Sequence, residues 1–371
     1  MLVRHHAFDK ALKKILIDPG DFYTKVYVLI PAGERGNSNS SYAFYGRNFF
    51  PTLVSEASAT GDKKIYYEDG NSFYNVGYDC SGLTLDQTIK ELNVSGVNTF
   101  NEYLILKKVI FDYADNNDEI EIDIVIDIPF KLEVFKEIRE KLDNTTIELR
   151  AFRGYDKRNI VKSALVKINL VSAGDAVSGF LKNLKKDFKS ALFIDIGYKK
   201  TKVYLVNCQT GVELFKFSDL GISIYYEKIL NLFSEKNIKD IDFFWLVKQV
   251  ELCCEQLEVK NEREKRASRI VRKILRKRVS DYDISLVLEN VRWDLNKDFR
   301  RLASDILTSH YTNTTMWVDI LVVTGGGAFL NGDILCTSLV NDGYFFSDIY
   351  IDKLQPYTLL EGMTNELMNS E

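Results

Sequence analysis

The chain has 371 residues and a formal net charge of −4, and 46% of its residues are hydrophobic against 27% charged. This composition is typical of a globular protein with room for two domains, and it excludes a generally polyanion-binding surface and, without a run of about 18 apolar residues, a membrane span. The 5 cysteines form no CxxC pair and only 3 histidines are present, which argues against a disulfide framework or a zinc site and favours a reducing cytoplasm.

One sequence pattern occurs twice. Residues 15–29 and residues 192–206 both contain an apolar run, Asp-x-Gly, three variable residues, Thr-Lys-Val-Tyr and a second apolar run. Each copy predicts a β-hairpin whose glycine lies at the bend, in a turn of about five or six residues. A repeat at this spacing indicates an architecture built from two related halves.

The composition of each hairpin favours phosphate binding. Asp18 and Asp195 end the first strands, while Lys25 and Lys202 open the return strands. Backbone N–H groups and a lysine suit phosphate oxygens, and carboxylates suit the hydration shell of a magnesium ion. The alternative is a pair of ordinary surface hairpins with turn-forming Asp and Gly, which two copies in one register make less favourable.

The chain between the two copies alternates strands and helices. The aromatic runs and polar turns of residues 31–95 predict a small, strand-rich insertion. Apolar spacing then predicts a helix over 98–114, a strand over 122–128, a helix over 132–142 and strands over 147–152 and 160–171.

A cluster of small residues, 172–179, precedes the next predicted helix and contains Asp175. A helix start of this kind allows close approach of an anionic ligand. The alternative for Asp175 is a helix N-cap without a chemical role.

The C-terminal half is mostly helical after the second hairpin. A helical insertion covers about 235–285, and its basic segment 260–278 suits nucleic acid, an acidic subunit or simply solvent. A helix over 296–311 precedes a buried strand, 317–324, that runs into Gly325-Gly326-Gly327-Ala328. Glycines at a strand end let the backbone lie against a planar ligand or a phosphate.

Together these motifs resemble the actin, Hsp70 and sugar-kinase superfamily. Within it the chain is most similar to bacterial actin-like proteins of the ParM and Alp type, on segments 50–54, 74–77, 128–129 and 356–363. The resemblance implies an α/β fold of two related lobes, each a mixed sheet with flanking helices, around a nucleotide cleft. Lobe I would cover 1–190 and lobe II 191–371, with the terminal helix packing back on lobe I.

The resemblance also implies roles for residues. Asp18 and Asp195 would hold Mg²⁺ through water, and Asp175 is the nearest match to the residue that activates the attacking water. ATP or ADP would be bound by two turns and the late glycines: Gly20, Asp21, Phe22, Tyr23 and Lys25; Gly197, Tyr198 and Lys199; and Gly325, Gly326, Gly327 and Ala328. The motifs do not distinguish ATP from GTP.

The implied function is ATP hydrolysis coupled to head-to-tail filament assembly, which segregates plasmid DNA through a separate DNA-binding adaptor. No direct DNA contact and no membrane partner are expected. A first alternative is a sugar-type kinase of the same fold, in which Asp175 would deprotonate a substrate hydroxyl. A second is a non-enzymatic nucleotide-sensing scaffold, which would not need Asp18, Asp195 and Lys25.

Overall fold

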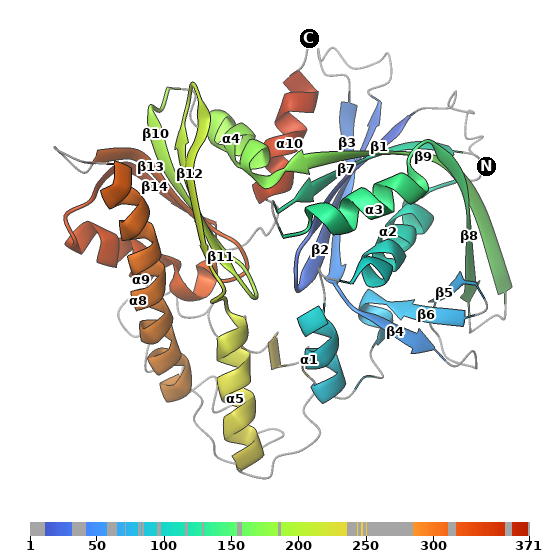
Figure 1. Ribbon diagram of the computed structural model, residues 1–371, viewed down its shortest axis with the longest axis horizontal. Helices are drawn as coiled ribbons and strands as arrows, with labels where there is room; N and C mark the ends of the chain where they lie inside the picture. The colour runs from blue at the N-terminus through green and yellow to red at the C-terminus, as the bar shows by residue number, and fades with distance from the viewer. Residues whose placement is uncertain are drawn as a thin grey trace, which may run out of the picture. The chain divides into compact units, whose positions relative to one another are not determined.

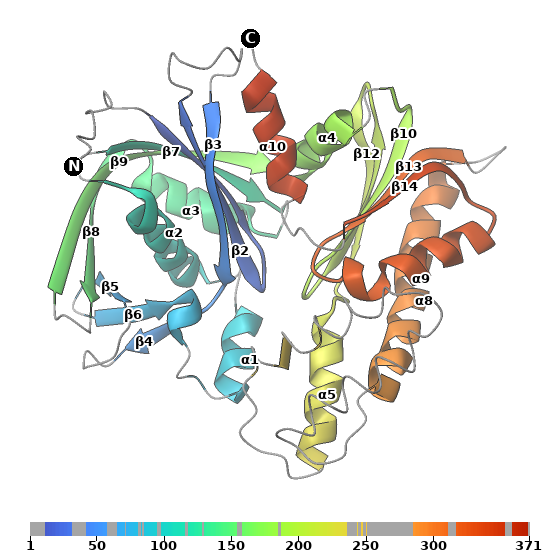
Figure 2. The same cartoon turned by 180° about the vertical axis from the view of Figure 1, so that it is seen from behind.

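The computed structural model describes residues 12–31, 42–57, 65–70, 72–80, 83, 85–94, 98–115, 118–127, 130–153, 158–184, 187–235, 243, 246–247, 250, 285–310, 317–352 and 358–369. By its contacts the chain divides into two compact units. The first comprises Met1–Phe180 and Leu359–Glu371, and the second comprises Leu181–Thr358. Figures 1 and 2 show the helices and strands of each unit from opposite sides.

The first unit is built on a mixed nine-stranded sheet with the order β3-β2-β1-β7-β9-β8-β5-β6-β4. Its strands are β1 (Lys13–Pro19), β2 (Tyr23–Pro31), β3 (Tyr42–Pro51), β4 (Val54–Ala57), β5 (Ile65–Asp69), β6 (Ser72–Val76), β7 (Asp118–Ile126), β8 (Thr145–Arg153) and β9 (Arg158–Ser172). Strands β1, β7 and β9 run parallel, while β1 and β2 form an antiparallel hairpin. Segment 31–95 thus supplies β3 at one edge and β5, β6 and β4 at the other, so its strands extend the main sheet.

The described residues of the first unit also form helices. They are η1 (Gly77–Cys80), α1 (Leu85–Val94), α2 (Thr99–Tyr113), α3 (Leu132–Leu142), α4 (Ala173–Leu184) and α10 (Thr358–Asn369), and the division between units passes through α4. Helices α2 and α3 lie side by side against one face (Figure 1). Alternate residues of β7, from Ile120 to Ile126, point into that core with Val109 and Ile138. The intervening residues of the strands therefore face the other side, where Asp18 lies.

The second unit repeats the same core arrangement with five strands in the order β12-β11-β10-β13-β14. The strands are β10 (Ser190–Ile196), β11 (Thr201–Asn207), β12 (Gly211–Ser218), β13 (Trp317–Thr324) and β14 (Phe345–Ile351), and the helices are α5 (Ser223–Glu235), α8 (Ser285–His310) and α9 (Ala328–Asn341). Strand β10 pairs antiparallel with β11 and parallel with β13, as β1 does with β2 and β7. Both views show α8 and α9 side by side on one face of this sheet (Figures 1 and 2).

Several details differ from the sequence-based prediction. The hairpin turns are shorter than expected, with residues 20–22 between β1 and β2 and residues 197–200 between β10 and β11. Helix α8 starts well before the predicted residue 296. The basic segment 260–278, and most of the predicted insertion 235–285, lie outside the described residues. Within the described part of the chain, no helix combines the length and apolar character needed to cross a membrane.

Candidate functional site: two equivalent hairpin turns

The first hairpin joins Asp18 and Lys25 directly. The two residues are partners in the β1–β2 register, and Lys25 Nζ lies 2.7 Å from Asp18 Oδ2. Both side chains are largely buried, with 17% of Lys25 and 13% of Asp18 exposed. Gly20 lies at the bend, where a Cβ would come within 2.6 Å of the carbonyl oxygen of Tyr23. The glycine is required because the turn has no room for a side chain there.

The second hairpin has the same construction. Asp195 and Lys202 are register partners, and Lys202 Nζ lies 3.3 Å from Asp195 Oδ2. Gly197 closes the turn by donating its N–H to the carbonyl oxygen of Lys200 at 2.8 Å, and a Cβ on Gly197 would crowd that same oxygen. The sequence repeat therefore produces a repeat of charge pairing and of turn geometry.

The first turn directs its carbonyl groups toward two other segments of its unit. Thr52 donates its hydroxyl to the Gly20 carbonyl oxygen at 2.8 Å and its N–H to that of Phe22 at 2.8 Å. Lys131 Nζ donates to the carbonyl oxygen of Pro19. A planar trans peptide points its C=O and N–H in opposite directions. The N–H groups of Asp21 and Tyr23 therefore point away from Thr52.

The carbonyl oxygens of the second turn are also hydrogen-bonded by another segment of their unit, but the donors are different. The N–H of Ile222 donates to the Gly197 carbonyl oxygen at 3.1 Å, and the N–H of Ser223 donates to that of Tyr198 at 2.9 Å. By the same planarity, the N–H groups of Tyr198 and Lys199 point away from the start of α5. Both turns thus present consecutive or alternate amide hydrogens on the side opposite their carbonyl partners, which is the arrangement that binds anions.

The side chains of the turns are less available than their backbones. Phe22 and Tyr198 are only 6% and 8% exposed, and the Tyr198 ring stacks on Tyr226 of α5 with centroids 6.2 Å apart. Burial, with a smaller contribution from Glu227, raises the pKa of the Tyr198 hydroxyl above its usual value. A contribution of Tyr198 to phosphate binding would therefore come from its N–H.

The three glycines after β13 have different surroundings. Gly325 has a φ of +88°, and a Cβ there would overlap Asp195 Oδ1, so this position brings the backbone against the carboxylate. A Cβ at Gly327 would overlap the side chains of Ile196 and Ile222, whereas one at Gly326 would meet only Ile222 Cδ1 at 3.7 Å. Gly326 is thus the member of the triplet with room beside it.

Helix α9 begins next to this glycine turn. Its N-cap is Gly327, which has no side chain to bond the first N–H groups of the helix, and Ala328 is fully buried behind it. Because the N–H of Ala328 donates to the Gly325 carbonyl oxygen and that of Leu330 to the Gly327 carbonyl oxygen, both at 3.1 Å, it is the helix dipole that favours an anion at this end.

Asp175 lies in the first turn of α4 and is exposed. Ser172 Oγ donates to Asp175 Oδ2 at 2.6 Å, and Asp175 donates its backbone N–H to Ser172 Oγ at 3.1 Å. Ser172 is thus the N-cap residue of α4, since its Oγ accepts the N–H of the third helical residue. Asp175 therefore lies three positions after the N-cap and bonds the capping hydroxyl, so it is not itself the N-cap considered from sequence.

The chemistry of the two carboxylates fits a hydrated magnesium ion. Among the described residues, no three His, Cys, Asp or Glu side chains are grouped closely enough to hold a metal directly. Mg²⁺ keeps several waters and needs only one or two carboxylates, so each of Asp18 and Asp195, taken by itself, is chemically suited to hold such an ion through water.

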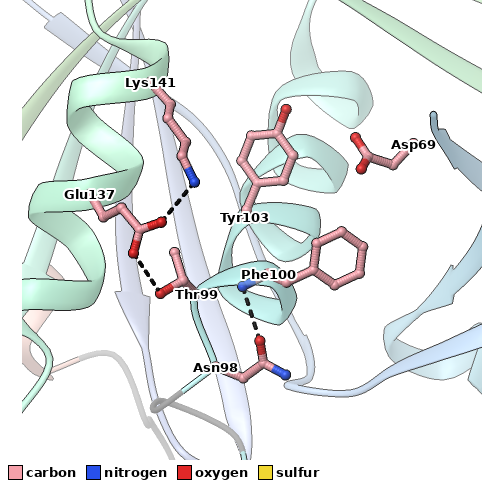
Figure 3. Close-up of a pocket in the computed structure, with 7 residues that line it drawn as sticks. All are labelled: Asp69, Asn98, Thr99, Phe100, Tyr103, Glu137 and Lys141. Atoms are coloured by element: carbon pink, nitrogen blue, oxygen red, sulfur yellow. Dashed lines mark hydrogen bonds and ion pairs between the residues drawn. The ribbon is translucent and has the colours of Figure 1, made fainter.

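A hollow of about 720 Å³ lies elsewhere in the first unit (Figure 3). It is lined by Asp69, Asn98, Thr99, Phe100, Tyr103, Glu137 and Lys141. Glu137 accepts hydrogen bonds from Thr99 at 3.1 Å and from Lys141 at 2.7 Å. The described residues that line it include none of the predicted nucleotide-binding residues, so size alone does not identify the site.

Sequence reasoning missed two residues that shape the first turn. Thr52 lies in segment 50–54, which entered only as a point of resemblance, and Lys131 is preceded by no recognisable motif. Both contacts join parts of the chain that are far apart in sequence, 32 positions for Thr52 and 112 for Lys131. Only the fold brings them together.

Comparison of the sequence finds no matching family profile and no matching curated protein. Comparison of the structure finds close matches. Ta0583, an archaeal actin homologue, has a TM-score of 0.61 and 16% identity over 95% of this chain and 99% of its own, and its complex with ADP has a TM-score of 0.60 and 15% identity over 96% and 99%. A non-polymerisable quadruple mutant of pCBH ParM has a TM-score of 0.62 and 15% identity over 95% and 98%. These matches confirm the predicted actin-like fold of the ParM and Alp type.

Proposed function

We propose that this protein binds and hydrolyses ATP with Mg²⁺ and assembles head-to-tail into filaments that segregate plasmid DNA. In this proposal the turns after Asp18 and Asp195 bind the same polyphosphate, one from each unit. The proposal depends on one observation above all, the equivalence of the two turns in register, in Asp–Lys pairing and in the direction of their amide hydrogens.

The residues would divide the nucleotide between them. The N–H groups of Asp21 and Tyr23 would bind phosphate oxygens from one side, and those of Tyr198 and Lys199 from the other. Gly326 and the start of α9 would lie along the adenosine and the α-phosphate. Mg²⁺, held through water by Asp18 and Asp195, would neutralise charge that develops during phosphoryl transfer.

In this proposal, Lys25 and Lys202 orient the two metal-binding carboxylates. Each is bonded to the Asp of its own hairpin, so each fixes the orientation of a carboxylate that would hold the metal's waters. Their charge lies near the turn as well, where it would favour a bound phosphate.

Support for assembly comes from proteins of the same fold. Structural neighbours include an Alp12 filament, with a TM-score of 0.52, and an archaeal actin homologue in complex with ADP. A head-to-tail contact between identical subunits does not close and so builds a filament. We propose that a separate DNA-binding adaptor connects the filament to a plasmid.

The first experiment measures phosphate release from Mg-ATP by wild-type protein and by Asp18→Asn and Asp195→Asn. Loss of the negative charge should remove the metal's partners and abolish release. Asp123→Asn is the matched control, because Asp123 is also buried and ion-paired, to Lys14 at 2.9 Å, on the same sheet as Asp18. It should lose comparable stability and retain phosphate release.

Two results would argue against the proposal. If the Asn variants released phosphate at the wild-type rate, Asp18 and Asp195 would not be part of the active site. ADP formation that requires an added sugar would favour the kinase alternative, since an ATPase needs no acceptor other than water.

A further inference from the structure

Lys131 is a buried cation beneath the first turn. It is the N-cap residue of α3, and 6% of its side chain is exposed. Its Nζ donates to the Pro19 carbonyl oxygen and lies 3.5 Å from Asp21 Oδ1 and 3.9 Å from Glu102 Oε1. Glu102, from α2, is itself 1% exposed. The contacts of Lys131 therefore connect the first turn to two helices of the core.

The charge of Lys131 is maintained by its surroundings. Burial lowers the pKa of the ammonium group, but the carboxylates of Glu102, Asp21, Asp127 and Asp18 together raise it more, so that the net pKa lies above the ordinary value. The group is therefore protonated at neutral pH. Buried charges persist when such partners compensate their desolvation.

Negative charges gather at the first turn, and the positive charge of Lys131 offsets part of them. Asp18 and Asp21 both lie at the turn, and a nucleotide adds several further negative charges. Like charges at short range disfavour each other strongly where water is excluded. Lys25 already forms a 2.7 Å pair with Asp18, which leaves Asp21 and the incoming phosphates to another cation. Lys131, whose Nζ lies 3.5 Å from Asp21 Oδ1, is such a cation among the described residues.

We propose that Lys131 is a positioning residue of the phosphate site: it anchors the Pro19 carbonyl and supplies the positive charge that lets a nucleotide polyphosphate approach Asp18 and Asp21. The inference rests on the proposed nucleotide function and extends it to a residue outside both hairpins. The Glu102 carboxylate, 3.9 Å from the ammonium group, compensates its buried charge, and Thr52 shapes the turn without contributing charge.

The test compares affinities for adenosine, ADP and Mg-ATP in wild-type protein and in Lys131→Met. A charge that acts on phosphates should matter more as phosphates are added, so the variant should bind adenosine normally and Mg-ATP about tenfold or more weakly. Lys131→Arg, which keeps the charge, should recover most of the affinity for Mg-ATP.

A second variant separates loss of charge from loss of fold. Lys131→Met leaves Glu102 buried opposite an apolar side chain, which destabilises the protein. The double variant Lys131→Met/Glu102→Leu replaces the pair with apolar residues and should restore the melting temperature without restoring affinity for Mg-ATP. Lys14→Met is the control for removing a buried lysine, because Lys14 lies on β1 about 13 Å before Asp18 and pairs with Asp123 and Glu121.

Three outcomes decide the inference. A weaker Mg-ATP affinity in the double variant, with Lys14→Met unchanged, supports it. Wild-type affinity in the double variant, or an equal loss for adenosine and Mg-ATP, overturns it while leaving the proposed function intact. Wild-type protein that binds no Mg-ATP overturns the proposed function, and the inference with it.

Discussion

At the scale of single residues, the molecule uses the same pair twice. An aspartate at the end of one strand accepts a hydrogen bond from a lysine near the start of the next strand. The distance from Lys Nζ to Asp Oδ2 is 2.7 Å in the first hairpin and 3.3 Å in the second. Two independent surface hairpins have no reason to share an ion pair in the same register. The glycines, by contrast, are individually specialised, since Gly325 and Gly327 are confined by neighbours and Gly326 is not.

That difference predicts separate effects within the glycine triplet. Gly327→Ala should destabilise the protein by about 1–3 kcal/mol, because the new Cβ overlaps Ile196 and Ile222. Gly326→Ala should have the melting temperature of the wild type but a lower affinity for ADP, because the added methyl group would take up space proposed for the nucleotide. Thermal melting and ADP titration measure the two effects, and Gly46→Ala, with no atom within 4 Å, is the neutral control.

An ADP affinity of Gly326→Ala equal to that of wild type would place the nucleotide elsewhere. A large loss of stability in Gly326→Ala would instead show that the backbone there is more confined than its neighbours indicate.

Sequence reasoning was strongest for residues within one motif. The hairpin positions of Asp18, Gly20, Asp195 and Gly197 could be predicted because a turn depends on residues only a few positions apart. Lys131 could not, because its partner Pro19 is 112 positions away. A lysine before a helix carries no sequence signal of its own, and only the folded structure brings Lys131 under the turn.

At the scale of elements, the two hairpins obtain the same geometry from different donors. The first turn uses the Thr52 hydroxyl and N–H with Lys131, and the second uses the N–H groups of Ile222 and Ser223. The start of α5 can approach the second turn because Gly221 has no side chain, and a Cβ there would overlap the Tyr198 carbonyl oxygen.

Gly221→Ala should therefore move α5 away from the turn. The overlap is with backbone atoms, which cannot rotate aside, so the cost should be about 1–3 kcal/mol in stability. Nucleotide affinity should fall in the same variant, since the N–H groups of Tyr198 and Lys199 lose their fixed direction. Denaturant unfolding and ADP titration provide the measurements. Unchanged affinity in a folded variant would show that the direction of these amides is unimportant.

The N-cap of α4 gives a test of Asp175. Ser172→Ala removes both bonds and should cost about 1 kcal/mol, whereas Asp175→Ala removes only the bond between the two side chains and should cost less. If Asp175 only caps the helix, the two variants should hydrolyse ATP equally well. A much slower rate in Asp175→Ala than in Ser172→Ala would assign it the water-activating role.

The sequence predicted elements better than their connections. Helix α3 was predicted at its observed bounds because its apolar residues recur at helical spacing. Strands β12 and β14 were not predicted: β12 alternates little between buried and exposed residues, and β14 is exposed along most of its length. That segment 31–95 joins both edges of the large sheet could not be predicted, since strand order depends on pairings between distant residues.

At the scale of the whole molecule, the duplicated core relates the fold to the proposed activity. Each unit contains an antiparallel hairpin joined to a parallel strand, β1–β2 with β7 and β10–β11 with β13. A nucleotide bound by both units would bias their relative angle, and such a change can control assembly.

Assembly should therefore depend on the nucleotide. With Mg-ATP, wild-type protein at tens of micromolar should scatter light, pellet on centrifugation and show filaments by electron microscopy, whereas Asp195→Asn should not. The Asp123→Asn variant should still pellet, because its partner Lys14 lies four residues before Asp18 on β1 and outside the turn. Wild-type protein that stays in the supernatant with Mg-ATP would contradict the filament proposal while leaving nucleotide binding open.

Calorimetric titration with Mg-ATP tests most directly whether both turns bind the same nucleotide. Wild-type protein should bind one nucleotide per chain, and Asp18→Asn and Asp195→Asn, which alter different units, should each weaken that same site. Two nucleotides per chain, or a variant that leaves binding unchanged, would contradict a shared site.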